Sequence, residues 1–307
     1  MRPGLALKRL SPATWERIQP VEARVRAVLE PVQLFRESLS SLALGALHAP
    51  SFRTVEGFVM FVGYPRSGHT LIGSLLNAHP NALVGQRIRV LRYLQAGFGR
   101  TRICGLVLLA DRRFARRGRV GNSRYSYRVP DQWQGRFTEL KLVGDSNVAN
   151  NSLRGRPGLV AQLAGVMGVP VRLVHVIRNP YDNIATMSIE NRTSLSQAVD
   201  RYFDLCQGAS EVRAATSAGD WLDVRHEDLV DEPAATLRRL CEFLLLPADD
   251  SYVQTCASVV FRRPHYSRHK VAWTDELIGD VATRALAYPF LEGYEFEVSS
   301  ARASTNT

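Results

Sequence analysis

The sequence of 307 residues lacks any apolar run long enough to cross a membrane. Its first twenty residues, "MRPGLALKRLSPATWERIQP", contain no apolar core of the kind that a signal peptide needs. The apolar run "SLALGALHAP", from Ser41 to Pro50, is far shorter than the roughly 20 apolar residues of a membrane-spanning helix. We therefore expect a chain with no transmembrane segment and no membrane anchor.

Cysteine pairs and histidine clusters are also missing. The four cysteines, Cys104, Cys206, Cys241 and Cys256, form no C-x-x-C motif, and no cluster of histidines stands near them. Cys206 and Cys241 fall at apolar positions of predicted helices, so we expect them to fill the core. This cysteine usage gives no metal-ligand pattern and predicts a reducing, cytoplasmic compartment.

Acidic residues are fewer than basic ones. The chain has 39 Lys and Arg against 29 Asp and Glu, a net charge of +10, and most of the basic residues are arginines. Arginine is well shaped to bind phosphate or sulfate oxygens in pairs, and a positive field favours an anionic ligand. A solvated basic surface would account for the same charge. Nucleic acid would also suit it, but no nucleic-acid recognition fold is visible, and we expect no such partner.

Internal repeats and low-complexity tracts are absent, and the chain divides in two by pattern. Residues 1–56 carry spaced apolar residues without strand signals, which predicts a helical N-terminal arm. Residues 57–307 are predicted to form the main domain. Four short apolar runs in it are typical of buried parallel strands: "GFVMFVGYP" from Gly57, "FTELKLVG" from Phe137, and the runs around Val171 and Leu222.

Amphipathic helices separate these apolar runs. One is predicted from Leu195 to Ala209 and another after Pro233. Alternating strands and helices predict an α/β fold with three layers, α/β/α, around a central parallel sheet. Ligands of such sheets bind at the carboxyl ends of the strands. The segment from Asp111 to Phe137 is rich in Arg, Gly and aromatic residues without a clear period, and we expect it to run over the rim of the sheet.

The first candidate ligand loop is "GYPRSGHT", from Gly63 to Thr70, between a predicted strand and a predicted helix. It is close to the nucleotide-binding pattern G-x-x-x-x-G-K-[ST], but His69 stands at the lysine position and the cation is Arg66. A glycine turn of this kind exposes backbone N–H groups, and the helix start adds partial positive charge. The pattern favours an anion-binding loop over a purely structural turn.

The second candidate loop follows the apolar run around Val171, in "HVIRNPYDNIATMS". Arg178 leaves the carboxyl end of the predicted strand, Pro180 suits the start of a helix, and Thr186 lies about two turns further on. An arginine and a hydroxyl so placed can bind one phosphate together. A helix-capping turn with a surface arginine would show the same pattern, and the first loop favours the binding interpretation.

Together the two loops resemble the signature loops of the PAPS-dependent sulfotransferases, in particular the bacterial and Golgi-type enzymes that act on carbohydrates or proteins. In that family P-[KR]-S-G-T-T holds the 5′-phosphosulfate and R-x-P-x-D-x-x-x-[ST] holds the 3′-phosphate. The resemblance implies a P-loop-type fold, PAPS (3′-phosphoadenosine 5′-phosphosulfate) as co-substrate, and no metal. The cofactor-binding residues that it implies are Pro65, Arg66, Ser67, Gly68, His69, Thr70, Arg178 and Thr186.

Two later segments are similar to the same family. "VRHEDLVDEPAATLRRLCEFL", from Val224, resembles the motif that begins Y-E-D-L, with His226 in place of the tyrosine that packs by the adenine. "YSRHKVAWTDE", from Tyr266, resembles the basic segment that closes over the cofactor, which implies a contact from Arg268. The resemblance therefore covers most of the chain, from residue 61 to 276.

The sequence departs from the family at the residue that removes the proton from the acceptor. Relatives often carry a glutamate just beyond the "AHPN" helix end, and this chain has Gln86 and Arg87 there. Asp145, after a predicted strand, is the first candidate base, and His69 is the other. Arg66 is the residue expected to meet the transferring sulfuryl group.

The resemblance implies transfer of the sulfuryl group from PAPS to a hydroxyl or amine of a small-molecule, carbohydrate or lipid acceptor. The missing glutamate motivates an alternative, a catalytically weak relative that binds PAP or PAPS without turnover. A P-loop kinase or other nucleotide-binding protein is a further alternative, disfavoured by the absent lysine of the nucleotide-binding pattern.

Overall fold

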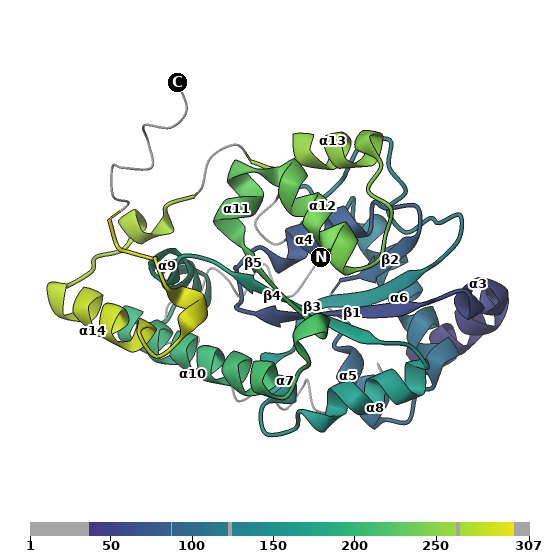
Figure 1. The fold of residues 1–307 in the computed structure, drawn as a ribbon, viewed down its shortest axis with the longest axis horizontal. Coiled ribbons are helices and arrows are strands. Elements are labelled where there is room, and N and C mark those ends of the chain that lie inside the picture. Colours follow the sequence, from purple (N-terminus) through teal and green to yellow (C-terminus); the bar gives the residue numbers. More distant parts are fainter. Residues whose placement is uncertain (1–36, 87, 122–124, 262–264, 298–307) are drawn as a thin grey trace.

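A computed structural model shows how the chain folds, and it describes residues 37–86, 88–121, 125–261 and 265–297. In these residues five strands form one sheet in the order β2-β3-β1-β4-β5, and all neighbours are parallel (Figure 1). The strands are β1 (Gly57–Gly63), β2 (Ala82–Gly85), β3 (Leu142–Val148), β4 (Val171–Ile177) and β5 (Trp221–Arg225). β1 lies in the middle and is buried along its whole length, as its unbroken apolar run predicts.

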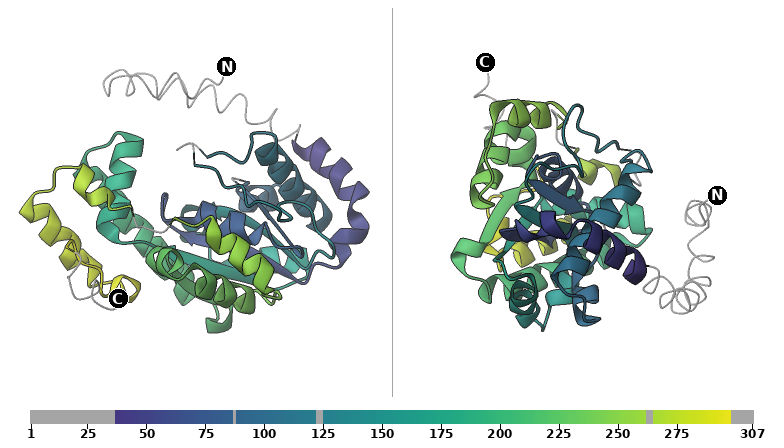
Figure 2. Two further views of the ribbon diagram at one scale, coloured as in Figure 1. Left: turned by 90° about the horizontal axis from the view of Figure 1, so that it is seen from above. Right: turned by 90° about the vertical axis from the view of Figure 1, so that its right-hand side faces the viewer.

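Helices cover both faces of the sheet, which confirms the predicted three-layer α/β/α fold (Figure 1). The helices are α3 (Ala49–Arg53), α4 (His69–Leu76), α5 (Val90–Gln95), α6 (Arg100–Ala115), α7 (Asn150–Leu153), α8 (Gly158–Met167), α9 (Pro180–Asn191), α10 (Leu195–Ala214), α11 (His226–Asp231), α12 (Pro233–Phe243), α13 (Asp250–Ser258) and α14 (Asp275–Ala285). Short 3-10 helices span Ala218–Asp220, Ser267–Lys270 and Pro289–Leu291. Figure 2 shows the sheet between its helical layers from two further directions.

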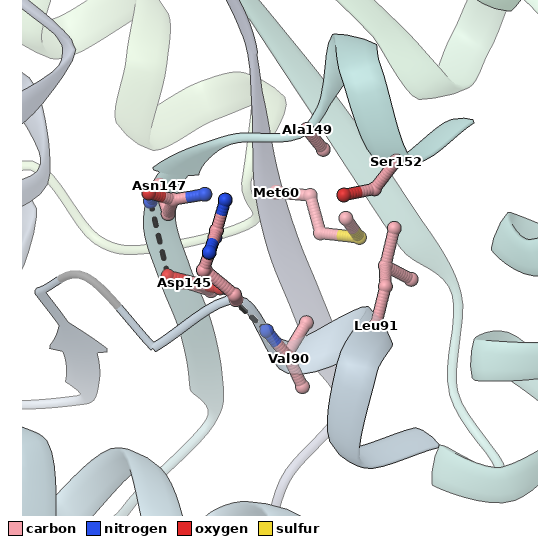
Figure 3. A pocket seen from close by; sticks show the side chains of 8 residues that line it. Met60, Val90, Leu91, Asp145, Asn147, Ala149 and Ser152 are labelled. Atoms are coloured by element: carbon pink, nitrogen blue, oxygen red, sulfur yellow. Dashed lines mark hydrogen bonds between the residues drawn. The ribbon is translucent and has the colours of Figure 1, made fainter. Parts of the chain in front are cut away.

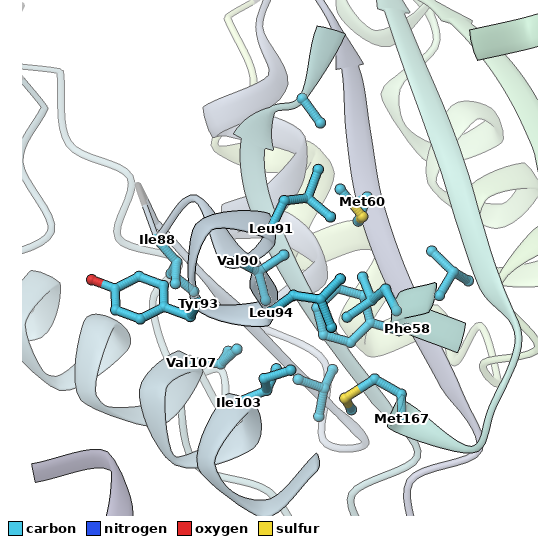
Figure 4. Close-up of a cluster of buried hydrophobic side chains, with 14 of the residues drawn as sticks. Phe58, Met60, Ile88, Val90, Leu91, Tyr93, Leu94, Ile103, Val107 and Met167 are labelled. Atoms are coloured by element: carbon cyan, nitrogen blue, oxygen red, sulfur yellow. The ribbon is translucent and has the colours of Figure 1, made fainter. Parts of the chain in front are cut away.

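The core consists of separate apolar clusters on the two sides of the sheet. Helices α4, α12 and α13 pack on one face, and α5, α6 and α8 pack on the other. In Figure 4, Met60 of β1 lies beside Leu91 of α5, and Ile103 and Val107 of α6 belong to the same cluster. Cys206 and Cys241 are fully buried, as predicted, and all four cysteines are free thiols. This packing holds the carboxyl ends of the strands, where both candidate loops begin, in fixed positions.

Two sequence-based predictions of local structure need correction. The strand predicted from Phe137 begins only at Leu142, and β2 was not predicted, because a run of four residues directly after a helix end carries little pattern. The start of the predicted rim segment, residues 111–115, is the last part of α6. Beyond α6 the segment is held by a buried ion pair between Arg119 and Asp111, whose N–O distance is 2.6 Å.

The described part of the predicted N-terminal arm is helical. Residues 37–47 form a helix that lies against α6, where the Gly105 Cα is so near the Ser41 carbonyl that a Cβ there would come within 2.3 Å of it. The carboxylate of Glu37 accepts hydrogen bonds from Tyr93 and Arg113. Residues 1–36 of the predicted arm lie outside the described residues.

Candidate functional site

The first loop connects β1 to α4 at the centre of the sheet's carboxyl edge. Gly63 has φ 141° and lies so close to β4 that a Cβ would stand 2.6 Å from the carbonyl oxygen of Val176. Gly68, with φ 104°, caps the N-terminus of α4. Between them the Ser67 N–H donates to the Tyr64 carbonyl at 3.1 Å. The two glycines are required because a side chain at either position would strain the backbone, so the sequence pattern and the turn agree.

Three buried polar atoms near this loop have no hydrogen-bond partner among the described residues. They are the Ser67 hydroxyl, the Asn183 Oδ1 and the His226 Nδ1. The other end of the Asn183 amide donates to the Pro65 carbonyl at 3.0 Å, so Asn183 of α9 lies directly beside the loop. Buried polar groups are nearly always paired in a protein interior. Unpaired ones gathered around a glycine-rich loop therefore fit a site for a polar, phosphate-bearing ligand.

The loop cation, Arg66, has an unusual backbone and an acidic partner. Its φ of 76° is left-handed, which is uncommon for a residue other than glycine and points to constraint by the loop. Its guanidinium forms an ion pair of 2.5 Å with Glu190, near the C-terminal end of α9, and both side chains are about one-third exposed. Glu190 lies one helical turn beyond Thr186, so it shares that face of α9.

The second loop connects β4 to α9 and contains Arg178. This side chain is 7% exposed, and its donors reach the Arg66 carbonyl at 3.2 Å, the His265 carbonyl at 2.6 Å and the Thr186 hydroxyl at 3.5 Å. Among the described residues, the acceptors of its hydrogen bonds are neutral oxygens. Burial lowers the pKa of Arg178, although Asp182 and Glu227 act in the opposite direction. A buried guanidinium with neutral acceptors is suited to an anionic ligand, because an uncompensated buried charge is costly.

Other polar residues hold the second loop in place. Asn179 caps α9 by accepting from the Tyr181 N–H at 3.0 Å, and its own N–H donates to Glu227 at 2.9 Å. Asp182 pairs with Arg268, 86 residues away, at 2.6 Å. The remaining N–H groups of Arg268 donate to the carbonyls of residues 295 and 296 at 2.8 and 2.5 Å. In the structure the buried Arg268 side chain therefore links the late basic segment to α9.

His226 lies against the first loop from the start of α11. A Cβ on Gly68 would come within 2.6 Å of its Nδ1. Burial, together with the nearby charge of Arg178, lowers the pKa of His226 to about 3. The imidazole is therefore neutral at physiological pH, and it suits stacking or hydrogen bonding to a base better than pairing with phosphate.

Both candidate bases lie near the end of β3, but on opposite faces of the sheet. His69, at the start of α4, has its Nδ1 2.7 Å from the carbonyl oxygen of Ser146. Since a carbonyl only accepts, Nδ1 carries the proton and the lone pair of the neutral ring lies on Nε2. The neighbouring residue Asp145 points to the opposite face of the sheet, because Ser146 contacts Gly73 of α4 and Asp145 contacts the start of α5.

Asp145 lines a small cavity beside Met60, Asn147 and Ser152 (Figure 3). Its carboxylate accepts backbone hydrogen bonds from Val90 at 2.9 Å and Asn147 at 3.0 Å. Burial raises the pKa of Asp145 to about 6, although these bonds act in the opposite direction. A carboxylate with such a pKa can accept a proton near neutral pH, and it also stabilises the N-terminus of α5.

Five residues that the sequence predicted at the site lie close to the carboxyl ends of β1 and β4 in the structure. They are Arg66, Ser67, Arg178, Thr186 and His226. Sequence reasoning did not single out Glu190 or Asn183. Both could have been found from their spacing along α9, because Asn183 lies one turn after Pro180 and Glu190 lies one turn after Thr186.

Comparison with known proteins bears on this arrangement. Residues 171–250 match the model of a family described as the sulfotransferase family. The sulfotransferase resemblance is confirmed. The matched segment runs from β4 to the start of α13, and it contains Arg178, Thr186 and His226. No curated protein matches the chain at a significant level.

Several solved structures are similar to this chain. The sulfotransferase domain from the Synechococcus PCC 7002 olefin synthase is 15% identical, with a TM-score of 0.47, and the match covers 76% of this chain and 96% of that domain. Sulfotransferase STF1 from Mycobacterium tuberculosis H37Rv is 14% identical, with a TM-score of 0.47 and coverages of 80% and 81%. Mouse sulfotransferase SULT7A1 complexed with PAP is 12% identical, with a TM-score of 0.40 and coverages of 73% and 68%.

Two negative findings apply to the part of the chain that the structure describes. It contains no group of three or more His, Cys, Asp or Glu side chains arranged to hold a metal ion. None of its helices combines the length and apolar character needed to traverse a bilayer.

Proposed function

We propose that this protein transfers a sulfuryl group from PAPS to a hydroxyl or amine of an acceptor. One observation carries the proposal. Arg178, buried and hydrogen-bonded to neutral oxygens of the described residues, donates to the backbone carbonyl of Arg66, so the two loops that we propose as anion loops lie against each other. The family match supports the same activity over the half of the site that it covers.

The residues of the site fit a ligand with two phosphate groups. The backbone of residues 65–70, with the Ser67 hydroxyl and Arg66, would hold the 5′-phosphosulfate at the start of α4. Arg178 and Thr186 would hold the 3′-phosphate, and the neutral His226 would lie beside the adenine. Arg268 acts through Asp182 and the second loop, and we assign it to positioning rather than to a direct contact.

Sulfuryl transfer makes one bond from sulfur to the acceptor, S–O for a hydroxyl or S–N for an amine, and breaks the S–O bond to the 5′-phosphate, so negative charge grows on the leaving phosphate. By analogy with phosphoryl transfer, catalysis then consists mainly of positioning and electrostatic stabilisation. Arg66 and the loop N–H groups would stabilise the leaving oxygen. The acceptor's proton would go to Asp145, with His69 Nε2 as the alternative. The proposal assigns no role to a metal.

The acceptor is proposed to be a small molecule, a carbohydrate or a lipid that approaches past the rim segment. Tyr125 of this segment contacts the Phe261 ring at 4.8 Å between centroids, and Trp133 is 36% exposed with Arg136 over its ring. Exposed aromatic rings of this kind stack on sugars and other rings. Screening candidate acceptors with labelled PAPS is the experiment that identifies the acceptor class.

Thermal unfolding should separate the sulfotransferase from the kinase alternative. We expect PAP to raise the melting temperature more than ATP or ATP with Mg²⁺, because at equal concentration the ligand that binds the folded state more tightly stabilises it more. Scanning fluorimetry with each nucleotide at matched concentrations measures this. A larger increase with ATP and Mg²⁺ than with PAP would contradict the proposal. PAP binding without turnover on any acceptor would favour the binding-only relative.

Replacing Arg178 with alanine should weaken PAP binding by roughly 10- to 100-fold, since a hydrogen bond to a charged group contributes about 1.5–3 kcal/mol. Titration calorimetry measures the affinity. The matched control is Arg238→Ala, which removes an arginine paired with Asp250 on the far helices α12 and α13. If both variants are folded and bind PAP equally well, Arg178 does not hold the 3′-phosphate.

A further inference from the structure

A chain of buried polar side chains runs from the first loop to the edge of the sheet. It begins at Tyr64, between Gly63 and Pro65, whose hydroxyl lies 3.3 Å from the Nε2 of His175 on β4. The Nδ1 of His175 lies 2.8 Å from Asp223 Oδ1 on β5. Tyr64 and His175 are both fully buried, whereas the Asp223 side chain is 49% exposed.

The sheet register brings these three residues together. Val62 pairs with His175 across β1 and β4, and His175 pairs with Asp223 across β4 and β5. The Trp221 indole N–H also donates to Asp223, at 2.9 Å. Burial alone would raise the pKa of Asp223, but the bonds from His175 and Trp221, with the nearby charge of Arg213, lower it. Asp223 is therefore an ionised acceptor.

The direction of each proton follows from this. An ionised carboxylate only accepts, so His175 carries its proton on Nδ1 and presents the Nε2 lone pair to Tyr64. Burial raises the pKa of the Tyr64 hydroxyl well above its usual value, so the hydroxyl stays protonated and donates to that lone pair. In this row of three side chains each donated proton has an acceptor. The half-exposed Asp223 carboxylate fixes the tautomer of His175, as carboxylates beside metal-binding and catalytic histidines do.

Tyr64 connects this chain to the ligand loop. Its carbonyl accepts the Ser67 N–H at 3.1 Å, a bond within the turn that presents the unpaired Ser67 hydroxyl. Its ring stacks on Tyr202 of α10, with 4.6 Å between centroids. We propose that Tyr64, His175 and Asp223 form a positioning relay, which holds the first loop in its anion-binding shape from behind.

The proposed relay rests on the proposed function in one measurement only, the affinity for PAP. Tyr64→Phe removes the hydroxyl and keeps the ring, and we expect PAP affinity to fall about 3- to 10-fold, the effect of losing one net hydrogen bond. Hydrogen exchange in a peptide covering residues 64–70 should speed up by a similar factor. The matched control is Tyr202→Phe, which removes a buried hydroxyl from the stacked neighbour, outside the relay, and should leave both measurements unchanged.

Asp223→Ala tests the exposed end of the relay. His175 Nδ1 and the Trp221 indole N–H both bond to Asp223 Oδ1, at 2.8 and 2.9 Å, so this variant removes the acceptor that holds the imidazole proton on Nδ1. We expect a shift towards the Nε2 tautomer in the ¹⁵N shifts of His175, together with faster loop exchange. A purely structural role would lower thermal stability without the tautomer change or the local exchange effect.

Three outcomes decide whether the relay holds the first loop. Tyr64→Phe behaving like Tyr202→Phe in PAP affinity and loop exchange would overturn the relay, as would a tautomer change in Asp223→Ala without any effect on the loop. Local loosening in both relay variants would support it. If the unmodified protein does not bind PAP, the proposed function fails, and loop exchange still decides the relay.

Discussion

Replacement of Arg66 by alanine is expected to lower the turnover of sulfuryl transfer by about 10²–10³-fold, which corresponds to about 3–4 kcal/mol of lost transition-state stabilisation. The reason is that Arg66 is the cation of the first loop and would face the leaving phosphate, where charge grows during transfer. Initial rates with labelled PAPS and an acceptor from the screen measure the effect.

Arg66 forms an ion pair with Glu190, so a change at Glu190 is the matched control for Arg66→Ala. Glu190→Gln removes the negative charge from this 2.5 Å ion pair but keeps the guanidinium. We expect PAP binding to be retained or strengthened in this variant, because a negative charge is removed from an anion site. A fall in turnover of similar size in both variants would show that the ion pair, rather than the cation, matters. Turnover of Arg66→Ala within about threefold of the unmodified rate would contradict the assignment.

Replacement of Asp145 by asparagine is expected to lower turnover by about 10²–10⁴-fold while PAP binding survives, since loss of a general base has an effect of this size and the side chain keeps its shape. The buried carboxyl has a pKa raised to about 6. A base acts in its ionised form, so turnover of the unmodified protein should rise with pH through about 6 and level off above it. This limb of the pH profile should disappear in Asp145→Asn.

His69→Asn is the control that separates the two candidate bases. The asparagine amide can still donate to the Ser146 carbonyl, as His69 Nδ1 does at 2.7 Å, but it lacks Nε2. Near-normal turnover in Asp145→Asn together with a large loss in His69→Asn would move the role to His69. Asp145 would then serve only to hold the start of α5.

The strand–turn–helix form of the two loops was predictable from the sequence because it depends on neighbouring residues. Gly63 and Gly68 allow a turn that other residues would strain, and the apolar run before them specifies a buried strand. The same local rules predicted the helix that begins at Pro180. Fold class followed from the alternation of such segments, whereas the short strand β2 escaped prediction because four residues contain too little pattern.

Which side chains meet across the site was decided only by the tertiary structure. The contacts of Arg178 with Arg66, of Arg268 with Asp182 and of Tyr64 with His175 join residues 112, 86 and 111 positions apart. Strand order and register determine such pairs, and local sequence does not encode them. Arg268 is an example, since its motif implied a ligand contact, and the fold gives it the carboxylate of Asp182 as a buried partner. The sequence by itself thus determined the two strand–turn–helix loops and the sheet that carries them. The packing of β1 between β3 and β4 decided which side chains of the two loops meet, because strand order and register bring together residues that are distant in the sequence.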